Sequence, residues 1–403
     1  MELFWLEHKK LWRKKIVKIC VLLCFVYCVI FGSILSFQWF SFGSSDDYTS
    51  AFGNNFDGYT VIKDSQEYAL SFGGELTDET LQQIVSDYQQ MEADGMEEEL
   101  EKTDWQIVNS WLGTLYPELR DTSNYKTMIS YVDPDKLTGF YERRQQVLDE
   151  FLEVSGQVGA EKEYLHQIDG KVEKPFHYEW VEGWSTLLGS MVADLGVVMA
   201  LFLGIVLSSL FAGEWHDNTS TLVLTTRNGW GKIALAKILT GLAFTVELFA
   251  LLAVSSVISQ LFFMGTAGWN MPIQNIKLIA VAPMNMLQAE IYEYAFVLLG
   301  AIGFAGIVMF ISAAVKNNVL TLLLSLAVVY GPMMIAEYLP YGMQKALDLI
   351  PLVGSSTDIF RTNTFRIFGK LIWSPYLLIT IPVLIGILCM PFAIKSWSRR
   401  MKA

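Results

Sequence analysis

Long apolar runs dominate the hydrophobic pattern of this chain. Six of them, each separated from the next by polar or turn-forming residues, are long enough as helices to cross about 30 Å of hydrocarbon. They cover residues 16–37, 186–212, 233–264, 292–315, 319–336 and 371–394. The pattern therefore predicts an α-helical polytopic membrane protein with six transmembrane helices, and the lipid membrane is its first expected partner.

Residues 1–15, which precede the first run, mix apolar with basic side chains. This pattern is typical of a cytoplasmic amphipathic helix that lies at the interface, with its basic groups near anionic headgroups. The run 16–37 is too long for a signal peptide, so we expect it to be retained as transmembrane helix 1. The basic residues ahead of it place the N-terminus in the cytoplasm.

The polar region 38–183 has helical periodicity over much of its length. Apolar positions recur at helical spacing in 76–102 and 134–154, and a capping box at Thr103 and Gln106 opens a helix that ends at Leu115. Glycine-containing turns near its start indicate short strands. We expect a mainly helical domain, with α+β character possible, of about 145 residues, which is enough to bury its own core.

Charge is distributed unevenly between this region and the rest of the chain. Between Ser41 and Gly183 there are 10 Lys and Arg against 30 Asp and Glu, whereas the remainder holds 19 basic and 11 acidic residues. Basic residues gather before the first span, after the second and fourth, and in the tail. The positive-inside rule then predicts a multi-pass cell-membrane protein with both termini cytoplasmic and an acidic extracytoplasmic domain at 38–183, followed by transmembrane helices 2–6 in 184–403.

Composition also bears on partners. Nucleic-acid binding is disfavoured, because no basic stripe with interleaved aromatic residues is present. The acidic outer domain would attract cationic peptides by long-range steering, although an ordinary solvated surface is the favoured interpretation.

Catalytic and metal-binding chemistry find little support. The four histidines are scattered, with no HExxH or Cys/His cluster and no GxSxG motif, so we expect neither a metal site nor a catalytic residue. Cys20, Cys24 and Cys28 recur on one helix face and are expected to pack as small hydrophobes. The acidic region has no cysteine, which excludes a disulfide scaffold there.

Four polar or small-residue features stand out at the spans. Gly196, Ala200, Gly204 and Ser208 recur every fourth residue, which favours close helix packing, within this chain or against a second subunit. Glu247 falls in the middle of the third run, where an acid marks a possible substrate path or proton-linked site, or bridges helices. Two further features are expected at the outer boundary: solvated acids at Glu290 and Glu293, and an aromatic belt formed by Tyr178, Trp180 and Trp184.

The polar link 211–237, between the second and third runs, carries the remaining charged motif. Gly229-Trp230-Gly231-Lys232 lacks the first glycine and the final Ser or Thr of a P-loop. We therefore expect this chain to bind no cofactor, and any ATP to be bound by a partner.

This layout resembles the permease subunits of ABC-2-type ABC transporters, in particular exporters of Gram-positive bacteria with a large insertion after the first span. The residues that carry the likeness are the amphipathic start, FAGE at 211–214, the run 226–237, KPFHYEWVEGW at 174–184 and FRIFGKLIWSP at 365–375. The resemblance covers essentially the whole chain. It implies a transporter subunit that is not itself an enzyme, a second permease subunit in a homo- or heterodimer, and a separate ATP-binding subunit that holds ATP and Mg.

In that family the link between spans two and three is the coupling helix, which docks on the ATP-binding subunit. By similarity the coupling segment is 213–231, and the contact residues at or beside it are Glu214, Asn218, Thr219, Arg227, Trp230, Lys232 and Lys237. Two positions depart from the family pattern: Asn218-Thr219 replaces a frequent Gly-Thr, and Gly229-Trp230 replaces a frequent Gly-Arg.

Two other functions stay open at the level of sequence. The chain could be a membrane sensor or resistance module whose acidic outer domain binds a cationic peptide. It could also be a channel or carrier that works without an ATPase, which the single mid-span acid and the lack of visible inverted repeats disfavour.

Overall fold

The computed structural model of this chain describes residues 1–41, 66, 73–96, 105–124, 126–188, 192–217, 231–354, 359–360 and 362–399. The described part is mostly helical, with two small antiparallel sheets, β1 with β2 and β3 with β4. Its elements are α1 (Glu2–Arg13), α2 (Lys15–Ser41), β1 (Gly74–Leu76), α4 (Asp78–Ala93), α6 (Trp105–Leu115), η1 (Pro117–Leu119), η2 (Met128–Ser130), η3 (Pro134–Lys136), α7 (Phe140–Val154), α8 (Ala160–Asp169), β2 (Phe176–Tyr178), α9 (Glu182–Thr186), α10 (Val192–His216), α12 (Lys232–Met264), η5 (Ile273–Asn275), α13 (Met286–Val315), α14 (Asn318–Ile335), η6 (Ala336–Tyr338), α15 (Tyr341–Leu347), β3 (Thr364–Ile367), β4 (Lys370–Trp373) and α16 (Ser374–Arg399).

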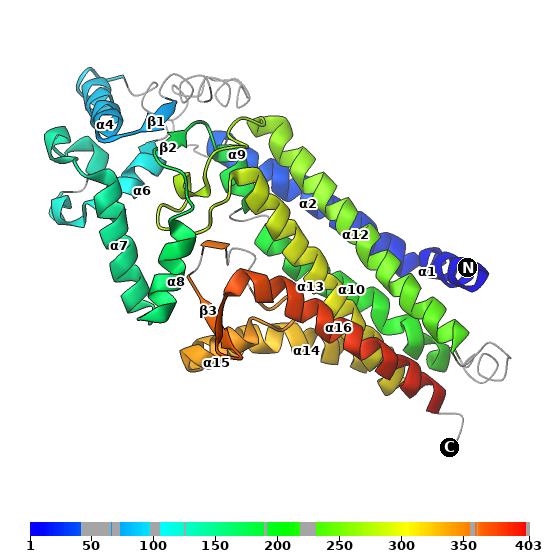
Figure 1. Cartoon of the computed structure of the whole chain (residues 1–403). Coiled ribbons are helices and arrows are strands. Elements are labelled where there is room, and N and C mark those ends of the chain that lie inside the picture. The colour runs from blue at the N-terminus through cyan, green and yellow to red at the C-terminus, as the bar shows by residue number, and fades with distance from the viewer. Residues whose placement is uncertain are drawn as a thin grey trace.

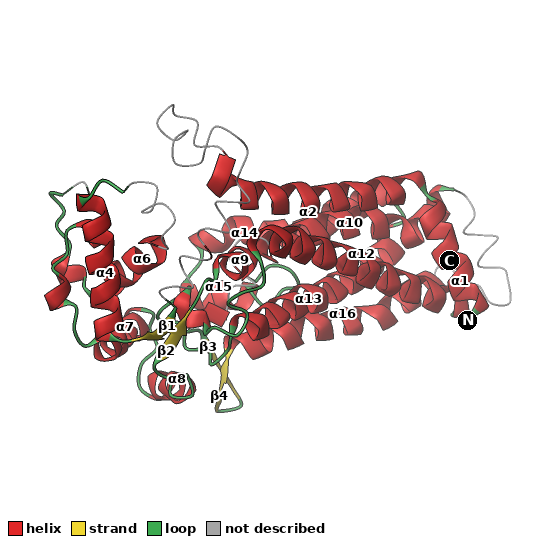
Figure 2. Ribbon diagram, turned by 90° about the horizontal axis from the view of Figure 1, so that it is seen from above, coloured by secondary structure: helices red, strands yellow, loops and turns green. Residues whose placement is uncertain are grey.

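The long helices lie side by side in one bundle, and the smaller helices gather at one end of it (Figures 1 and 2). The N-terminal helix α1 and the last turns of α16 lie at the opposite end, which we call the terminal end. The end that carries α4, α6, α7 and α8 is called the domain end. The two groups of polar side chains described below lie toward opposite ends of the bundle.

Five helices are long and apolar enough to cross a membrane, and they match the second to sixth expected spans. They are Asp194–His216, Lys232–Met264, Met286–Val315, Asn318–Tyr338 and Ser374–Ser398. The expected first span, 16–37, lies within the 27-residue helix α2, whose side chains from residue 31 onward are outside the described part. An α-helical membrane protein is therefore supported, and the count of six spans stays a prediction.

Two span boundaries differ from those expected, for local reasons. The α13 helix begins at Met286 rather than 292, because Asn285 and Gln288 form a capping box there. The α10 helix begins at Val192 rather than 186, because residues 182–186 form the separate helix α9.

The tightest helix contact in the bundle joins α13 to α16. A Cβ added at Gly303 would lie 2.3 Å from the carbonyl oxygen of Pro382, and one added at Gly386 would lie 2.5 Å from the Cα of Gly303. Gly306 meets the carbonyl oxygen of Gly386 in the same way, at 2.4 Å. The absence of side chains at these positions is what lets the two backbones touch.

The expected small-residue stripe packs mainly inside this chain. Ala200 and Ser208 are buried, and Gly204 faces the side chains of Leu322 and Leu326 on α14. A Cβ at Gly196, by contrast, would meet nothing within 4 Å among the described residues. The stripe was predicted, whereas the closer contact between α13 and α16 was not.

The three cysteines of α2 behave as expected. Cys20, Cys24 and Cys28 are free, buried and part of the bundle core. They pack as small hydrophobes on the face of α2 that lies against α12.

The helices at the domain end share a core with segments that come later in the chain. The β1–β2 pair joins residues 74–76 to 176–178, and the indole of Trp111 donates to the carbonyl of Asn275, in the segment that follows α12. The fully buried Arg144 forms a bidentate ion pair with Asp169 and also donates to the carbonyls of Leu278 and Ala280. Residues 265–285 are therefore an integral part of the folded unit at the domain end rather than a free loop. We call this unit, α4 to α9 with residues 265–285, the outer unit.

The expected aromatic belt is not at the protein surface. Tyr178, Trp180 and Trp184 are all buried. The Trp180 indole donates to the carbonyl of Met264, and the Trp184 indole donates to that of Ala267. That prediction was wrong, because the end of α12 and the loop after it cover these rings.

The α13–α16 contact makes a direct prediction for stability. Gly386→Ala forces its new methyl against the Gly303 backbone, so we expect a loss of about 1–3 kcal/mol of unfolding free energy from overpacking. The matched control is Gly196→Ala, which adds a methyl to a helix with open space around it. Denaturant unfolding in detergent measures both, and equal effects of the two changes would contradict the close contact.

The buried ion pair of the outer unit makes a second prediction. Asp169→Asn leaves the enclosed guanidinium of Arg144 without its counter-charge, so we expect a loss of about 3–5 kcal/mol. Arg366→Ala removes the exposed pair with Glu161 and should cost less than about 1 kcal/mol. Native-state hydrogen exchange of α7 and α8 would report the difference, and similar exchange in both variants would argue against it.

Candidate functional site

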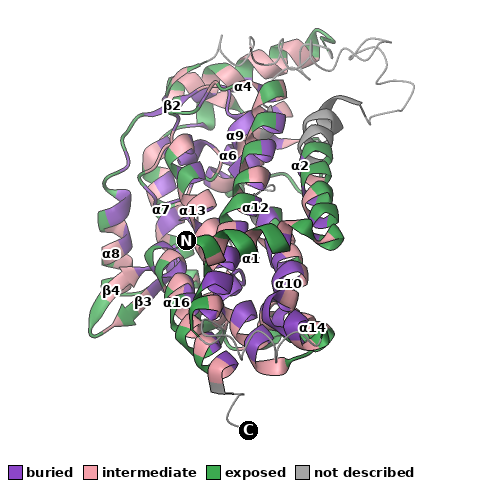
Figure 3. Ribbon diagram, turned by 90° about the vertical axis from the view of Figure 1, so that its right-hand side faces the viewer, coloured by how far each residue is buried: buried purple, intermediate pink, exposed green. Residues whose placement is uncertain are grey.

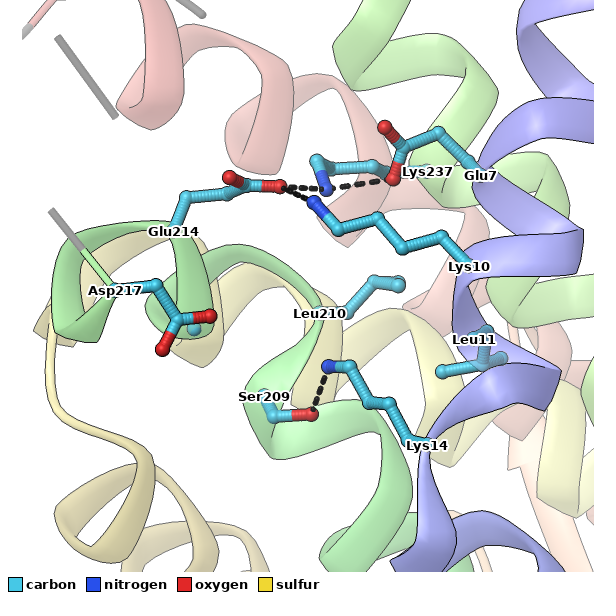
Figure 4. A pocket seen from close by; sticks show the side chains of 10 residues that line it. Glu7, Lys10, Leu11, Lys14, Ser209, Leu210, Glu214, Asp217 and Lys237 are labelled. Atoms are coloured by element: carbon cyan, nitrogen blue, oxygen red, sulfur yellow. Dashed lines mark hydrogen bonds and ion pairs between the residues drawn. The ribbon is translucent and has the colours of Figure 1, made fainter. Parts of the chain in front are cut away.

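Charged side chains from three helices meet at the terminal end of the bundle and line a small recess (Figure 4). We call this group the charge cluster; its members are Glu7 and Lys10 of α1, Lys14 between α1 and α2, Glu214 of α10, Asp217 just after α10, and Lys237 of α12. The α1 helix lies across the ends of the other two, which brings residues more than 200 positions apart in sequence into contact.

Lys237 and Glu214 form the buried centre of the charge cluster. Their side chains are only 2% and 4% exposed, and Lys237 Nζ lies 2.8 Å from Glu214 Oε1. Lys237 Nζ also donates to Glu7 Oε2 at 2.8 Å, and Lys10 Nζ donates to the same Glu214 oxygen at 2.5 Å. Because each charge has an opposite charge within hydrogen-bond distance, the desolvation cost of burying them is offset.

The outer lysines of the charge cluster differ in their surroundings. Burial lowers the pKa of Lys10, but its hydrogen bond to Glu214 and the charges of Glu214, Glu7 and Asp217 outweigh burial and raise it above the usual value. For Lys14, burial and the nearby charges of Lys237 and Lys10 lower the pKa. Lys14 Nζ donates to the hydroxyl of Ser209 at 2.9 Å. The cluster thus favours the charged form of Lys10, whereas burial and the neighbouring lysines weaken that preference at Lys14.

A second polar contact fixes α1 farther along α12. Glu247 accepts from the Trp12 indole at 3.0 Å, and its other oxygen lies 3.1 Å from His8 Nε2. Its side chain is 42% exposed. These contacts favour a role in anchoring α1; the substrate-path role of Glu247 stays a prediction.

The last turns of α10 are also clamped to α13. The backbone N–H groups of Phe211 and Ala212 both donate to the hydroxyl of Ser312 at 3.1 Å, and that hydroxyl donates to the carbonyl of Ser208 at 2.7 Å. The Ser312 side chain therefore enters the backbone hydrogen-bond ladder of α10 just before the link.

Aromatic rings surround the same turn. Trp397 of α16 packs against Phe211 and Trp215, with ring centroids 5.5 and 6.1 Å apart. The ammonium of Lys316 lies 4.3 Å from the Trp215 ring centroid, in a cation–π contact. The end of α10 is consequently tied to α1, α12, α13 and α16.

The structure brings together only some of the residues expected to act in coupling. Glu214 and Lys237 meet directly, and Lys232 is exposed at the first position of α12. The others, Asn218, Thr219, Arg227 and Trp230, lie outside the described residues. Glu7, Lys10 and Ser312 were not anticipated, and only the three-residue spacing of Glu7 and Lys10 on one face of α1 hinted at a role.

Two acids of α13 differ from expectation. Glu290 and Glu293, predicted to be solvated at the outer edge of a span, are 4% and 0% exposed. That prediction was wrong, because α13 begins at Met286, ahead of both positions, and the packing of the protein buries both side chains.

Neither metal chemistry nor known relatives define the site. Among the described residues, no group of three or more His, Cys, Asp and Glu side chains could hold a metal ion. Comparison of the chain with protein-family models, with curated proteins and with solved structures found no match.

The buried centre and the exposed rim of the charge cluster should contribute differently to the free energy of unfolding. Glu214→Gln removes the buried negative charge nearest Lys237, and we expect it to cost about 3 kcal/mol or more. Lys10→Met removes a side chain that is 51% exposed, and should cost less than about 1 kcal/mol. Denaturant unfolding of the solubilised chain compares them, and a Glu214→Gln variant as stable as Lys10→Met would refute the central role of Glu214.

Proposed function

We propose that this chain is the membrane-spanning permease subunit of an ABC-2-type ABC transporter, an exporter driven by a separate ATP-binding subunit. In this proposal the terminal end faces the cytoplasm and residues 38–183 lie outside. ATP and Mg are held by the partner, and the chain itself catalyses no reaction.

The observation that carries the proposal is the ion pair between Glu214 and Lys237. These residues lie near the two ends of the link 211–237, one on either side of its segment 218–230, so the pair joins the end of α10 to the start of α12. A subunit that pushes on the link therefore acts on both helices together. It also acts on α1 through Glu7 and Lys10, and on α13 through Ser312.

Charge supports the orientation. The basic residues of α1, of α12 at its start and of α16 at its end all lie at the terminal end, whereas the described helices of the acidic segment, α4, α6, α7 and α8, lie at the domain end. A basic end favours the cytoplasmic side of a membrane.

Exposed apolar surface supports lipid contact and a second permease subunit. Only 17% of the most apolar stretch of α14 is buried, and the residues that it exposes include Val319, Leu323 and Met334. Figure 3 shows a similar exposed stretch, in green, along α2. An outward apolar face of this kind fits lipid or another transmembrane helix. In this proposal a second permease subunit contacts such a face and forms a homo- or heterodimer with this chain.

A membrane sensor is the second candidate. One observation favours it. Helices α7 and α8 pack directly on residues 265–285, which join α12 to α13. A cationic peptide bound outside would then act on two long helices without being transported.

The docking role of the link can be tested by co-expression with a candidate ABC ATPase chosen from the genes that neighbour the gene for this chain. Scrambling residues 218–230 should abolish co-purification of the ATPase, because the contact surface is lost while the ion pair of Glu214 and Lys237 remains. Trp230→Ala, at the position that departs from the family pattern, should weaken co-purification at least several-fold.

The matched control for docking is Tyr338→Ser, which changes an exposed side chain at the domain end. It should leave ATPase recovery unchanged. Full recovery of the ATPase with the scrambled link would refute the docking role.

A further inference from the structure

Glu290 and Glu293 form a pair of carboxyl groups enclosed near the domain end of the bundle. They lie three residues apart on α13 and so share one helix face. Glu290 is 4% exposed and Glu293 is fully buried. Neither has a part in the charge cluster, which lies at the opposite end.

All four carboxyl oxygens of the pair lack a hydrogen-bond partner among the described residues. The polar group that acts on Glu290 is the neutral Tyr294 hydroxyl, which is paired with the hydroxyl of Ser256 of α12 at 2.8 Å. The titratable groups that act on the pair and on Tyr294 are the two acids themselves, Tyr294 and Cys28. No lysine, arginine or histidine is among them.

Two ionised carboxylates cannot be stable in such surroundings. Burying one unpaired carboxylate costs at least several kcal/mol, and a second beside it adds repulsion. A hard metal cation would need about six to eight oxygen ligands, which is more than four carboxyl oxygens and two hydroxyls bonded to one another supply. A proton on each carboxyl neutralises the charge and needs no cavity.

We propose that Glu290 and Glu293 form a proton-binding site, in which each carboxylate takes up one proton from water and holds it while this part of the bundle is closed. Opening of the domain end would admit water and release the protons to that side. This second step rests on the proposed transport cycle, whereas the first concerns the chain alone.

Infrared spectroscopy of the detergent-solubilised full chain tests the first step, since a protonated carboxyl and a carboxylate absorb at separate frequencies. At neutral pH the wild type should show a protonated-carboxyl band. Glu290→Gln and Glu293→Gln should each remove about half of its area, and the double variant should remove it all. The control Glu337→Gln, a change at an exposed acid, should leave the band unchanged.

Three results would overturn the proposal. They are a wild type without this band, a band that survives in the double variant, and a band that disappears when Na⁺, K⁺ or Ca²⁺ is added at constant pH, which would show a metal-ion site instead. The wild-type measurement does not depend on the folding of any variant. Because no ATPase is present, failure of the proton site is distinguishable from failure of the transport function.

The release step is tested with the complete complex in vesicles that contain a pH-sensitive dye. ATP should drive a pH change in the wild type and none in the double variant, with ATP hydrolysis retained in both. Equal pH changes in the two would overturn proton release by this pair.

Discussion

The buried contact between Glu214 and Lys237 constrains the whole terminal end of the molecule. Two charges removed from water are stable only while they remain paired, so α10 and α12 cannot separate there without a large penalty. Glu7 and Lys10 extend this constraint to α1, which runs across both helices. The need to keep these charges paired thereby fixes the positions of the two ends of the link. In the proposed function, a partner that pushes on the link would move the helices at both ends.

Direct contacts connect the link to the rest of the bundle, and in our proposal they carry a push on the link to the domain end. Ser312 bonds to the backbone of α10, and α13 in turn touches α16 backbone to backbone at Gly303 and Gly386. At the far end, residues 265–285 lock α12 and α13 to the outer unit through Arg144. Packed cores move between discrete arrangements rather than deforming continuously, so motion at the link would be felt at the domain end. The enclosed acids Glu290 and Glu293 lie where that motion would change access to water.

Local pattern predicted the elements well and their contacts poorly. The five apolar helices, the end of α6 at Leu115 and the apolar role of Cys24 follow from periodicity and composition, which are properties of short segments. The burial of Trp180 and Glu293 depends on which distant segment covers them, and no local signal encodes that. The coupling role of Glu214 came from a family resemblance; its pairing with Lys10 required the path of α1. The predictions for Asn218, Thr219, Arg227 and Trp230 concern residues outside the described part.

The central claim is that the Glu214–Lys237 pair passes force from the link to the domain end. Its most direct test is the distance between spin labels on exposed positions of α12 and η6, Ile258 and Tyr338, in the proposed complex with an ABC ATPase. We predict that ATP changes this distance in the wild type and in Lys10→Met, but not in Glu214→Gln, with the ATPase bound in all three. An ATP-driven change of the same size in Glu214→Gln would contradict the account.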